Sequence, residues 1–307
     1  MNAYGFEGRV AVVTGAGRGI GRAYARLLGE RGARVVVNDL GGTMEGAGAD
    51  AEPASSVARE IVATGGVAIA DTNDVATVEG AGAIVGAALE RFGRLDILIN
   101  NAGIMRWARF PEADAANLER HLAVHVGGSF NTTRAAWPHM VERGYGRIVM
   151  TTSTGMLGLP GNTAYATAKA GVIGMTRSLA AAGAAYGIKI NLIAPAAVTR
   201  MAGGSDSVEM SPDLVAPMAA FLAHEACPVT GEIYAVGAGR FARMFIASTE
   251  GYVHLGEQPT IEDVAENWAA INSEVGYFVP ADLSEWSAAF LAHLDPNNSS
   301  GAEPAAS

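Results

Sequence analysis

The stretch "RVAVVTGAGRGIGRAYARLLGERG" (residues 9–32) indicates how the whole chain folds. Residues 9–15 are a short β-branched run, which predicts a buried strand, and residues 19–32 have the pattern of a helix. The same alternation of short apolar runs and longer Ala-rich segments continues along the chain. Further strands are expected at 33–39, 67–71, 94–100, 146–152, 188–194 and 232–237, and helices near 53–64, 76–92 and 163–186, with a long helical region between 100 and 146.

Near-continuous apolar strands separated by helices predict a parallel sheet that is covered on both faces. Right-handed crossovers then give an α/β fold with a doubly wound, Rossmann-type parallel sheet. We expect a single nucleotide-binding domain over residues 1–240, followed by a helical C-terminal extension over 241–295. The last residues, 296–307, are polar and rich in Pro, Ala and Ser, which predicts a disordered tail.

The expected extension contains two helical patterns. "QPTIEDVAENWAAINSE" (258–274) predicts a helix that begins after Thr260, with acidic residues in its first turn. "LSEWSAAFLAHL" (283–294) carries a stripe of large apolar residues at helical spacing. That stripe is expected to pack on a core or on a neighbouring subunit, and it consists of Leu283, Trp286, Phe290 and Leu294.

Composition excludes several classes of protein. The 307 residues are half apolar, and the net charge of 21 − 31 = −10 argues against nucleic acid as a partner. Cys227 is the only cysteine, so no internal disulfide forms. The first 15 residues lack the pattern of a secretory signal, and no apolar run is long enough to cross a membrane. We therefore expect a soluble cytoplasmic protein that contacts no membrane.

The turn after the first strand, "TGAGRGIG" (14–21), predicts a phosphate site. Glycine lets a backbone approach a pyrophosphate closely, and the helix N-terminus offers unpaired N–H groups. The spacing is T-G-x-x-x-G-x-G, and the residues expected to meet the cofactor are Gly15, Arg18, Gly19, Ile20 and Gly21.

Asp39 ends the second expected strand, 39 − 19 = 20 residues after the second motif glycine. A carboxylate at that place hydrogen-bonds ribose hydroxyls and repels a 2′-phosphate. Asp39 therefore predicts NAD rather than NADP as the cofactor, although Arg18 would favour a 2′-phosphate.

Tyr165 and Lys169 lie one helical turn apart and so face the same way. A phenol with a pKa of about 10 is a poor base at neutral pH. A nearby ammonium and a positive nicotinamide favour the phenolate and lower that pKa. The pair therefore predicts a general base that takes the proton of an alcohol as hydride leaves.

Three motifs together resemble the short-chain dehydrogenases/reductases. They are TGxxxGIG at 14–21, "NNAG" at 100–103 and YxxxK at 165–169, and the resemblance spans roughly residues 8 to 240. It implies hydride transfer between a nicotinamide and a carbonyl/alcohol pair. It also implies a homodimer or homotetramer assembled through the helices near 114–142 and 163–186.

The family usually places a serine, which holds the substrate oxygen, 13 residues before the tyrosine. Here 165 − 13 = 152 is Thr152, and Ser153 follows it. Neighbouring side chains on a strand point to opposite faces, so both cannot reach the substrate unless the strand has ended. The spacing, and Gly155 ten residues before the tyrosine, favour Thr152, while the usual residue type favours Ser153. We predict Thr152 and keep Ser153 as the alternative.

"VHVGGSF" (124–130) places His125 where the family commonly has an asparagine that supports a proton-relay water. His121 and His125 also have the i, i+4 spacing of a helical zinc site. No glutamate follows His121 and no third ligand is evident, so no metal is predicted. G-x-S-x-G occurs nowhere, which argues against a hydrolase.

Further segments narrow the resemblance to one subgroup, the (3R)-hydroxyacyl-CoA dehydrogenase domain of peroxisomal multifunctional enzyme type 2. They are "VVVNDLGG" (35–42), "VHVGGSFNTTRAAWPHM" (124–140), "YGRIVMTTS" (145–153) and "VGAGR" (236–240). That subgroup has serine at the position of Thr152. The resemblance implies cofactor contacts from Asp74, Val75, Asn101, Ala102, Gly103, Pro195 and Thr199, together with Tyr165 and Lys169.

The substrate follows less directly from the residues. Arg106, Arg109, Arg240 and Arg243 lie near the expected site, either as partners for coenzyme A phosphates or in ordinary surface salt bridges. The Gly/Ser-rich loop 201–213 predicts a mobile lid, and its methionines suit an apolar ligand such as an acyl chain or a sterol. The leading prediction is NAD-dependent oxidation of a (3R)-3-hydroxyacyl-CoA. The alternatives are a steroid or cyclic alcohol, and a non-catalytic NAD-binding module.

Overall fold

The computed structural model describes residues 4–199 and 207–294. The predicted tail, 296–307, lies outside the described residues, as does the first half of the predicted lid at 201–213. The chain divides into two compact units, Met1–Met244 and Phe245–Ser307.

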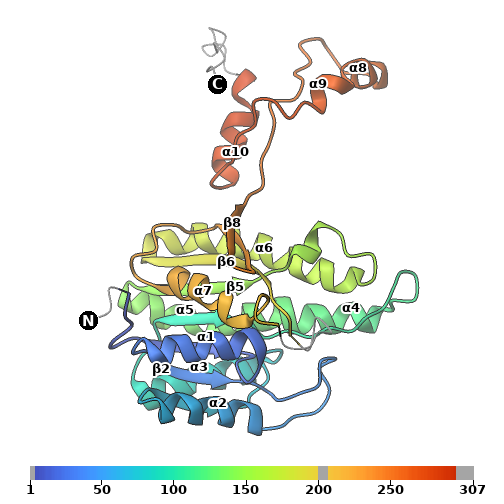
Figure 1. Cartoon of the computed structure of the whole chain (residues 1–307). Helices are drawn as coiled ribbons and strands as arrows, with labels where there is room; N and C mark the ends of the chain where they lie inside the picture. The colour runs from blue at the N-terminus through green and yellow to red at the C-terminus, as the bar shows by residue number, and fades with distance from the viewer. Residues whose placement is uncertain (1–3, 200–206, 295–307) are drawn as a thin grey trace. The chain divides into compact units, whose positions relative to one another are not determined.

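The first unit is built on one eight-stranded sheet with the strand order β3-β2-β1-β4-β5-β6-β7-β8 (Figure 1). β1 pairs in parallel with both β2 and β4, and the parallel pairing continues to β7. The doubly wound parallel sheet predicted from the sequence is therefore confirmed. The strands are β1 Val10–Thr14, β2 Arg34–Asn38, β3 Val67–Asp71, β4 Ile97–Asn100, β5 Gly146–Thr151, β6 Ile188–Ala196, β7 Ile233–Gly237 and β8 Arg240–Met244.

The last strand, β8, was not predicted, because Arg240 and Arg243 were expected only to follow the final strand. β8 returns antiparallel to β7, with Gly237 opposite Arg240. The two residues between them, Ala238 and Gly239, both have positive φ, 49° and 74°. That backbone is typical of a two-residue hairpin turn, whose twist matches the twist of the strands.

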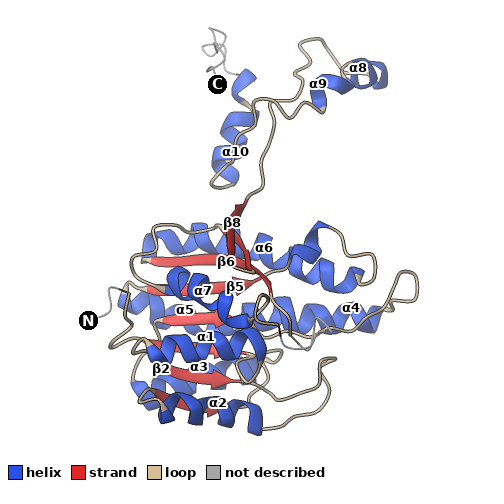
Figure 2. Ribbon diagram, in the orientation of Figure 1, coloured by secondary structure: helices blue, strands red, loops and turns tan. Residues whose placement is uncertain are grey.

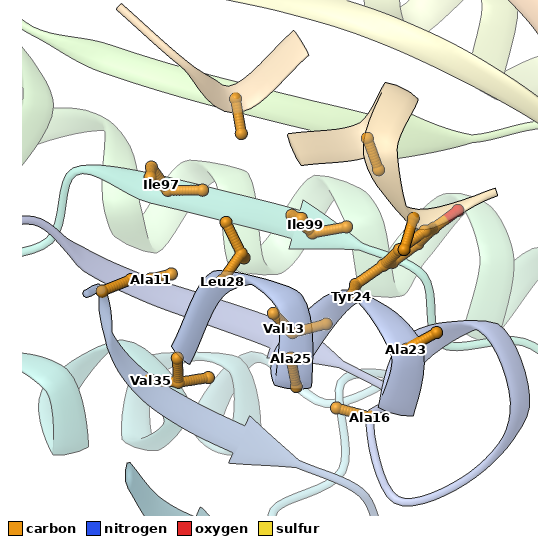
Figure 3. Packing of buried hydrophobic residues seen from close by; sticks show 14 of the residues in the cluster. Ala11, Val13, Ala16, Ala23, Tyr24, Ala25, Leu28, Val35, Ile97 and Ile99 are labelled. Carbon is orange, nitrogen blue, oxygen red and sulfur yellow. The ribbon is translucent and has the colours of Figure 1, made fainter. Parts of the chain in front are cut away.

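Helices cover both faces of the sheet (Figure 2). Alternate residues of β1 belong to different cores: Val13 packs with residues of α1, α2 and α7, whereas Val12 packs with residues of α3, α5 and α6. Figure 3 shows the first core, where Val13 and Ile99 face Leu28 of α1. The helices are α1 Gly19–Glu30, α2 Glu52–Ala63, α3 Val78–Phe92, α4 Ala115–His121, α5 Gly128–Arg143, α6 Thr163–Gly183 and α7 Ala216–Ala223.

The long helical region between β4 and β5 is not one regular α-helix. α4 runs through a π-helical turn, Leu122–Gly127, into α5. π-helical turns are rare in proteins, and those that occur are often found at functional sites. This turn carries His125.

The second unit contains α8 Ile261–Glu266, α9 Trp268–Ile271 and α10 Leu283–Phe290. Thr260 caps α8 in a reciprocal capping box with Asp263. The single helix predicted over 258–274 is interrupted at Asn267, whose side-chain amide and backbone N–H both donate to the Asp263 carbonyl, at 2.8 and 3.1 Å.

Within this chain the predicted apolar stripe does not pack on a core, since Leu283, Phe290 and Leu294 are all exposed. The other alternative, a neighbouring subunit, stays a prediction. Within that stripe the Trp286 and Phe290 rings stack at 4.6 Å. Across residues 4–199 and 207–294, every helix is too short or too polar to cross a membrane.

Candidate active site

The glycine turn between β1 and α1 forms a cradle that only glycine can line. Gly15 has a φ of +62°, and a Cβ there would lie 2.8 Å from the Ala102 Cα atom. A Cβ on Gly21 would lie 2.2 Å from the Gly15 carbonyl oxygen. The first residue before the helix, Arg18, makes no side-chain capping bond, so the N-terminus of α1 is left with uncapped N–H groups. The turn thus has the shape and the partial positive charge of a phosphate site.

A cleft of about 700 Å³ opens beside this turn at the carboxyl ends of the strands. It contains most of the residues predicted to bind the cofactor. The predicted residues that line it are Gly15, Arg18, Gly19, Ile20, Gly21, Asp39, Asp74, Val75, Asn101, Ala102, Gly103 and Thr199. Pro195, Tyr165 and Lys169 were also predicted to meet the cofactor, but they are not among the lining residues. Ser207–Asp213, from the described half of the predicted lid, contributes Val208, Ser211 and other residues to the same lining.

Asp39 lies in this cleft with both carboxylate oxygens engaged. One oxygen accepts the Gly17 N–H at 2.8 Å, and the other accepts the Gly41 N–H at 2.7 Å. An ionised carboxylate has about four lone-pair sites, so two remain for a ligand. Asp39 therefore holds the glycine turn and keeps acceptor capacity toward the cleft.

Asn101 connects β4 to the glycine turn. Its side-chain amide donates to the Thr14 and Gly15 carbonyls, both at 3.0 Å. Its backbone N–H and that of Ala102 donate to the Thr14 hydroxyl, each at 3.1 Å. The Asn101 side chain therefore shapes the turn, a role that sequence reasoning did not assign to it.

Tyr165, Lys169 and Ser153 meet at the first turns of α6. The Ser153 hydroxyl lies beside the Tyr165 ring, since its Oγ atom and the Tyr165 Cε1 atom are each 3.4 Å from the Cβ position of Gly155. The Lys169 Nζ atom donates to the Thr151 carbonyl at 2.8 Å and lies 5.7 Å from the centre of the Tyr165 ring. Asn162 begins this helix, and its side chain accepts the Tyr165 N–H at 3.1 Å. The tyrosine and the lysine are almost fully buried.

Burial changes the pKa of both groups in the ligand-free protein. It lowers the pKa of the Lys169 ammonium to about 7, because the charged form is removed from water. Burial also raises the pKa of Tyr165, and the hydrogen bond from Ser153 opposes that rise. The phenol is therefore protonated at neutral pH before a ligand adds its own charge and contacts.

The surroundings of the two candidate hydroxyls favour Ser153 over Thr152 as the one that faces a substrate. The Thr152 hydroxyl is fully buried and donates to the Lys169 carbonyl at 2.8 Å, so it points into the packing of α6. β5 ends at Thr151, and a 3₁₀ helix begins at Thr154, so Ser153 lies beyond the sheet edge. The alternative hydroxyl, Ser153, is the one beside the phenol.

His125 and His121 form a buried aromatic wall behind the phenol. Their rings stack at 5.9 Å, and both approach the Tyr165 ring edge-on, at 5.4 and 6.1 Å. The His125 Nε2 atom lies 3.0 Å from the Ile104 carbonyl oxygen. Within the described part of the chain, its Nδ1 atom is buried without a hydrogen-bond partner.

Burial, together with the charge of Lys169, holds the pKa of His125 well below the usual histidine value, so the ring is neutral. The pKa of His121 is lowered by burial too. The described residues contain no group of three or more His, Cys, Asp or Glu side chains that could hold a metal ion. His121 was noticed in the sequence only for its metal-like spacing, and its contact with Tyr165 depends on the packing of α4 against α6.

The four arginines considered for coenzyme A have different surroundings. Arg243 forms a two-point ion pair with Glu232, at 2.6 and 2.9 Å, on the hairpin of β7 and β8. Arg109 and Arg240 are exposed. Arg106 uses its backbone to contact buried residues near Tyr165. Of the two roles considered for these arginines, Arg243 therefore has the ordinary surface salt bridge.

Comparison with known proteins identifies the class of this site. A sequence model of the family described as short chain dehydrogenase matches residues 9–208, more than half of the chain. The chain therefore belongs to the short-chain dehydrogenase family, as its motifs predicted, and is an oxidoreductase of that family.

Among particular relatives, the chain is 42% identical over 277 residues to a short-chain type dehydrogenase/reductase of Mycobacterium tuberculosis, covering 89% of this chain and 96% of that protein. It is 40% identical to mouse peroxisomal multifunctional enzyme type 2 over 98% of its own length but only 43% of the mouse enzyme. The chain thus corresponds to less than half of that larger enzyme. A solved structure of a 7α-hydroxysteroid dehydrogenase with NADH and 7-oxo glycochenodeoxycholic acid superposes with a TM-score of 0.69 at 30% identity, over 77% of this chain and 95% of that one.

Proposed function

We propose that this protein oxidises a secondary alcohol with NAD⁺ as the hydride acceptor, and that its substrate is a (3R)-3-hydroxyacyl-CoA. The observation that carries the reaction is the meeting of Ser153, Tyr165 and Lys169 at the start of α6. The intact triad argues against the alternative of a non-catalytic nucleotide-binding module.

Ser153, Tyr165 and Lys169 have separate roles in removing the proton of the substrate hydroxyl. Ser153 holds the substrate oxygen through its hydroxyl, and the Tyr165 phenolate accepts the proton of the substrate hydroxyl. The Lys169 ammonium favours the phenolate by its charge and so offsets the burial that raises the phenol pKa. A bound NAD⁺ would supply the acceptor for the hydride of the carbinol carbon, so that the alcohol would become a ketone while the protein's own residues take the hydroxyl proton.

The cleft fits a dinucleotide and favours NAD over NADP. Gly15 and Gly21 leave room that a Cβ would fill, and the uncapped N-terminus of α1 suits a pyrophosphate. Asp39 has lone pairs free for the ribose hydroxyls and would repel a 2′-phosphate. Arg18 also lines the cleft, but its guanidinium is within 3.4 Å of the Gly42 carbonyl oxygen rather than free.

We assign His125 a positioning role. Its Nε2 atom contacts Ile104, and a Cβ on Gly103 would lie 2.7 Å from its ring, so the imidazole holds the segment after "NNAG" in place. The edge-on contact between the His125 and Tyr165 rings also fixes the position of the phenol. The Nδ1 atom, buried and without a hydrogen-bond partner among the described residues, suits a buried water that would take part in a proton relay.

The acyl-CoA substrate rests on the likeness to peroxisomal multifunctional enzyme type 2, which extends over nearly the whole of this chain. A second candidate, a steroid alcohol, is favoured by the likeness to a hydroxysteroid dehydrogenase that was solved with a bile-acid ketone. Both candidates use the same three side chains, so they differ only in what surrounds the reacting carbon.

The experiment is the absorbance of NADH formed by purified protein with NAD⁺ and matched (3R)- and (3S)-3-hydroxyacyl-CoA. Turnover of the R form alone is the expected result. Turnover of neither, with steroid alcohols oxidised instead, would support the second candidate. Tyr165→Phe is the control: it should abolish turnover while NADH binding, followed by fluorescence, stays within about twofold of wild type.

We also propose a homodimer or homotetramer that forms through α5 and α6. Phe130 on α5 is 49% exposed, which leaves an apolar side chain on this face for a second copy to cover. Light scattering of the purified protein tests this arrangement. A monomer at micromolar concentration would contradict it.

A further inference from the structure

Trp107 is a large aromatic side chain that stands exposed at the edge of the site. Its side chain is 56% exposed, and it follows the "NNAG" motif by four residues. Sequence reasoning assigned it no role. An exposed indole by itself carries little information, but its supports point to a use.

The backbone on both sides of Trp107 is fixed by buried polar side chains. Just before it, the Arg106 N–H donates to His121 Nε2 at 3.3 Å, and the Arg106 carbonyl accepts from the Asn162 amide at 3.0 Å. Just after it, Ala108 forms a parallel β-bridge with Asn162. His121 and Asn162 are completely buried. This irregular segment is therefore held as firmly as a strand.

The same supports connect Trp107 to the catalytic tyrosine. Asn162 also caps α6 by accepting the Tyr165 N–H at 3.1 Å. The indole ring lies along the backbone that leads into this helix, where a Cβ on Gly161 would come 3.2 Å from the indole Cζ3 atom. Because Gly161 has no side chain, the indole can lie against the backbone there, four residues before Tyr165 in the sequence.

A second apolar side chain, Leu159, lies near the phenol. The Cβ position of Gly155 is 3.4 Å from the Tyr165 ring and 3.5 Å from the Leu159 Cδ2 atom. Leu159 therefore stands beside the ring.

We propose that Trp107 determines substrate specificity by forming an apolar wall for the part of the substrate beyond its reacting carbon. This inference rests on the proposed function and adds to it that long apolar chains are preferred over short ones. The occupant is the hydrocarbon part of the substrate, because the indole lies against Gly161, just before the first turn of α6 that carries the phenol. A rigid aromatic wall binds a chain with little loss of conformational entropy in the protein.

The test compares (3R)-3-hydroxybutanoyl-CoA with (3R)-3-hydroxydodecanoyl-CoA for wild type, Trp107→Ala and Trp107→Phe. We expect kcat/KM for the long substrate to fall about tenfold in Trp107→Ala, with the short substrate nearly unchanged and Trp107→Phe intermediate. Gly161→Ala, which displaces the indole without removing it, should change the ratio in the same direction. Tyr186→Ala is the matched control, because Tyr186 is 46% exposed just after the other end of α6.

Equal losses for both substrates in Trp107→Ala, or no change in their ratio, would overturn the inference while leaving the proposed function intact. If wild type oxidises neither substrate, the proposed function fails by itself. The variants are then compared for binding of dodecanoyl-CoA and of CoA by calorimetry. A weaker dodecanoyl-CoA affinity in Trp107→Ala, with CoA unchanged, supports the wall, and equal affinities overturn it.

Discussion

The adjacent hydroxyls Thr152 and Ser153 offer a direct test of the site geometry. Ser153→Ala removes the hydroxyl that lies beside Tyr165 and lowers the pKa of its phenol. Loss of one donor that stabilises developing charge at a reacting oxygen typically costs about 10²–10³ in rate, or about 2.7–4 kcal/mol. Ser153 is half-buried, and its other contact is an acceptor bond from the Gly155 N–H at 3.1 Å. The variant should therefore lose activity and keep nearly all of its stability.

Thr152→Val should behave in the opposite way. The change keeps the shape of a fully buried side chain and removes its 2.8 Å hydrogen bond to the Lys169 carbonyl. The net loss from one such bond is about 1 kcal/mol, which lowers the Tm of a domain of this size by about 2–4 °C. Activity should stay within about tenfold of wild type, since Lys169 shifts only slightly.

The assay pairs initial rates of NADH formation with urea unfolding for both variants. The expected pattern is a loss of rate in one variant and a loss of stability in the other. If Thr152→Val lost as much kcat/KM as Ser153→Ala while unfolding at the wild-type urea concentration, the assignment of the hydroxyls would be refuted.

Three further predictions follow from single contacts. Lys169→Met removes the ammonium that favours the Tyr165 phenolate. The rising limb of the pH profile for alcohol oxidation should therefore move to higher pH by about one unit or more. An unchanged limb would contradict that role of Lys169. The buried Tyr24 hydroxyl (Figure 3) has no hydrogen-bond partner within the described residues. Tyr24→Phe should therefore keep the free energy of unfolding in urea unchanged or raise it by about 1 kcal/mol. A clear loss of stability would contradict this expectation. Asp39→Ala should weaken NADH binding about tenfold or more and reduce the preference for NADH over NADPH, since the carboxylate lines the cleft and accepts the Gly17 N–H at 2.8 Å. Fluorescence titration with both nucleotides measures the two affinities. An unaltered ratio of these affinities would contradict the prediction.

Much of the fold and the cofactor site could be predicted because their signals are local. Short apolar runs of five to seven residues predicted the strands that form the sheet as far as β7, and the glycine spacing at 14–21 predicted the turn that lines the cleft. β8 was missed because its alternating pattern, "RFARM", is no more apolar than a surface loop, and it forms only by pairing with β7.

The helix predicted over 258–274 shows the limit of periodicity within one segment. Its cap at Thr260 could be predicted from residue types, and the structure has that cap. The break at Asn267 could not, because it depends on whether an amide side chain bonds to the backbone or faces solvent.

The family, the doubly wound sheet, the glycine turn and the Tyr165–Lys169 pair could all be predicted from the sequence alone. Each of these depends on residues a few positions apart, whose geometry follows from one turn of helix or one strand. The preference for Ser153 over Thr152 needs the tertiary structure, because it depends on where β5 ends against α6. The contacts of the buried histidines with the phenol and of Trp107 with the segment before α6 need it too, since they join α4, α6 and an irregular segment that meet only when the chain is packed.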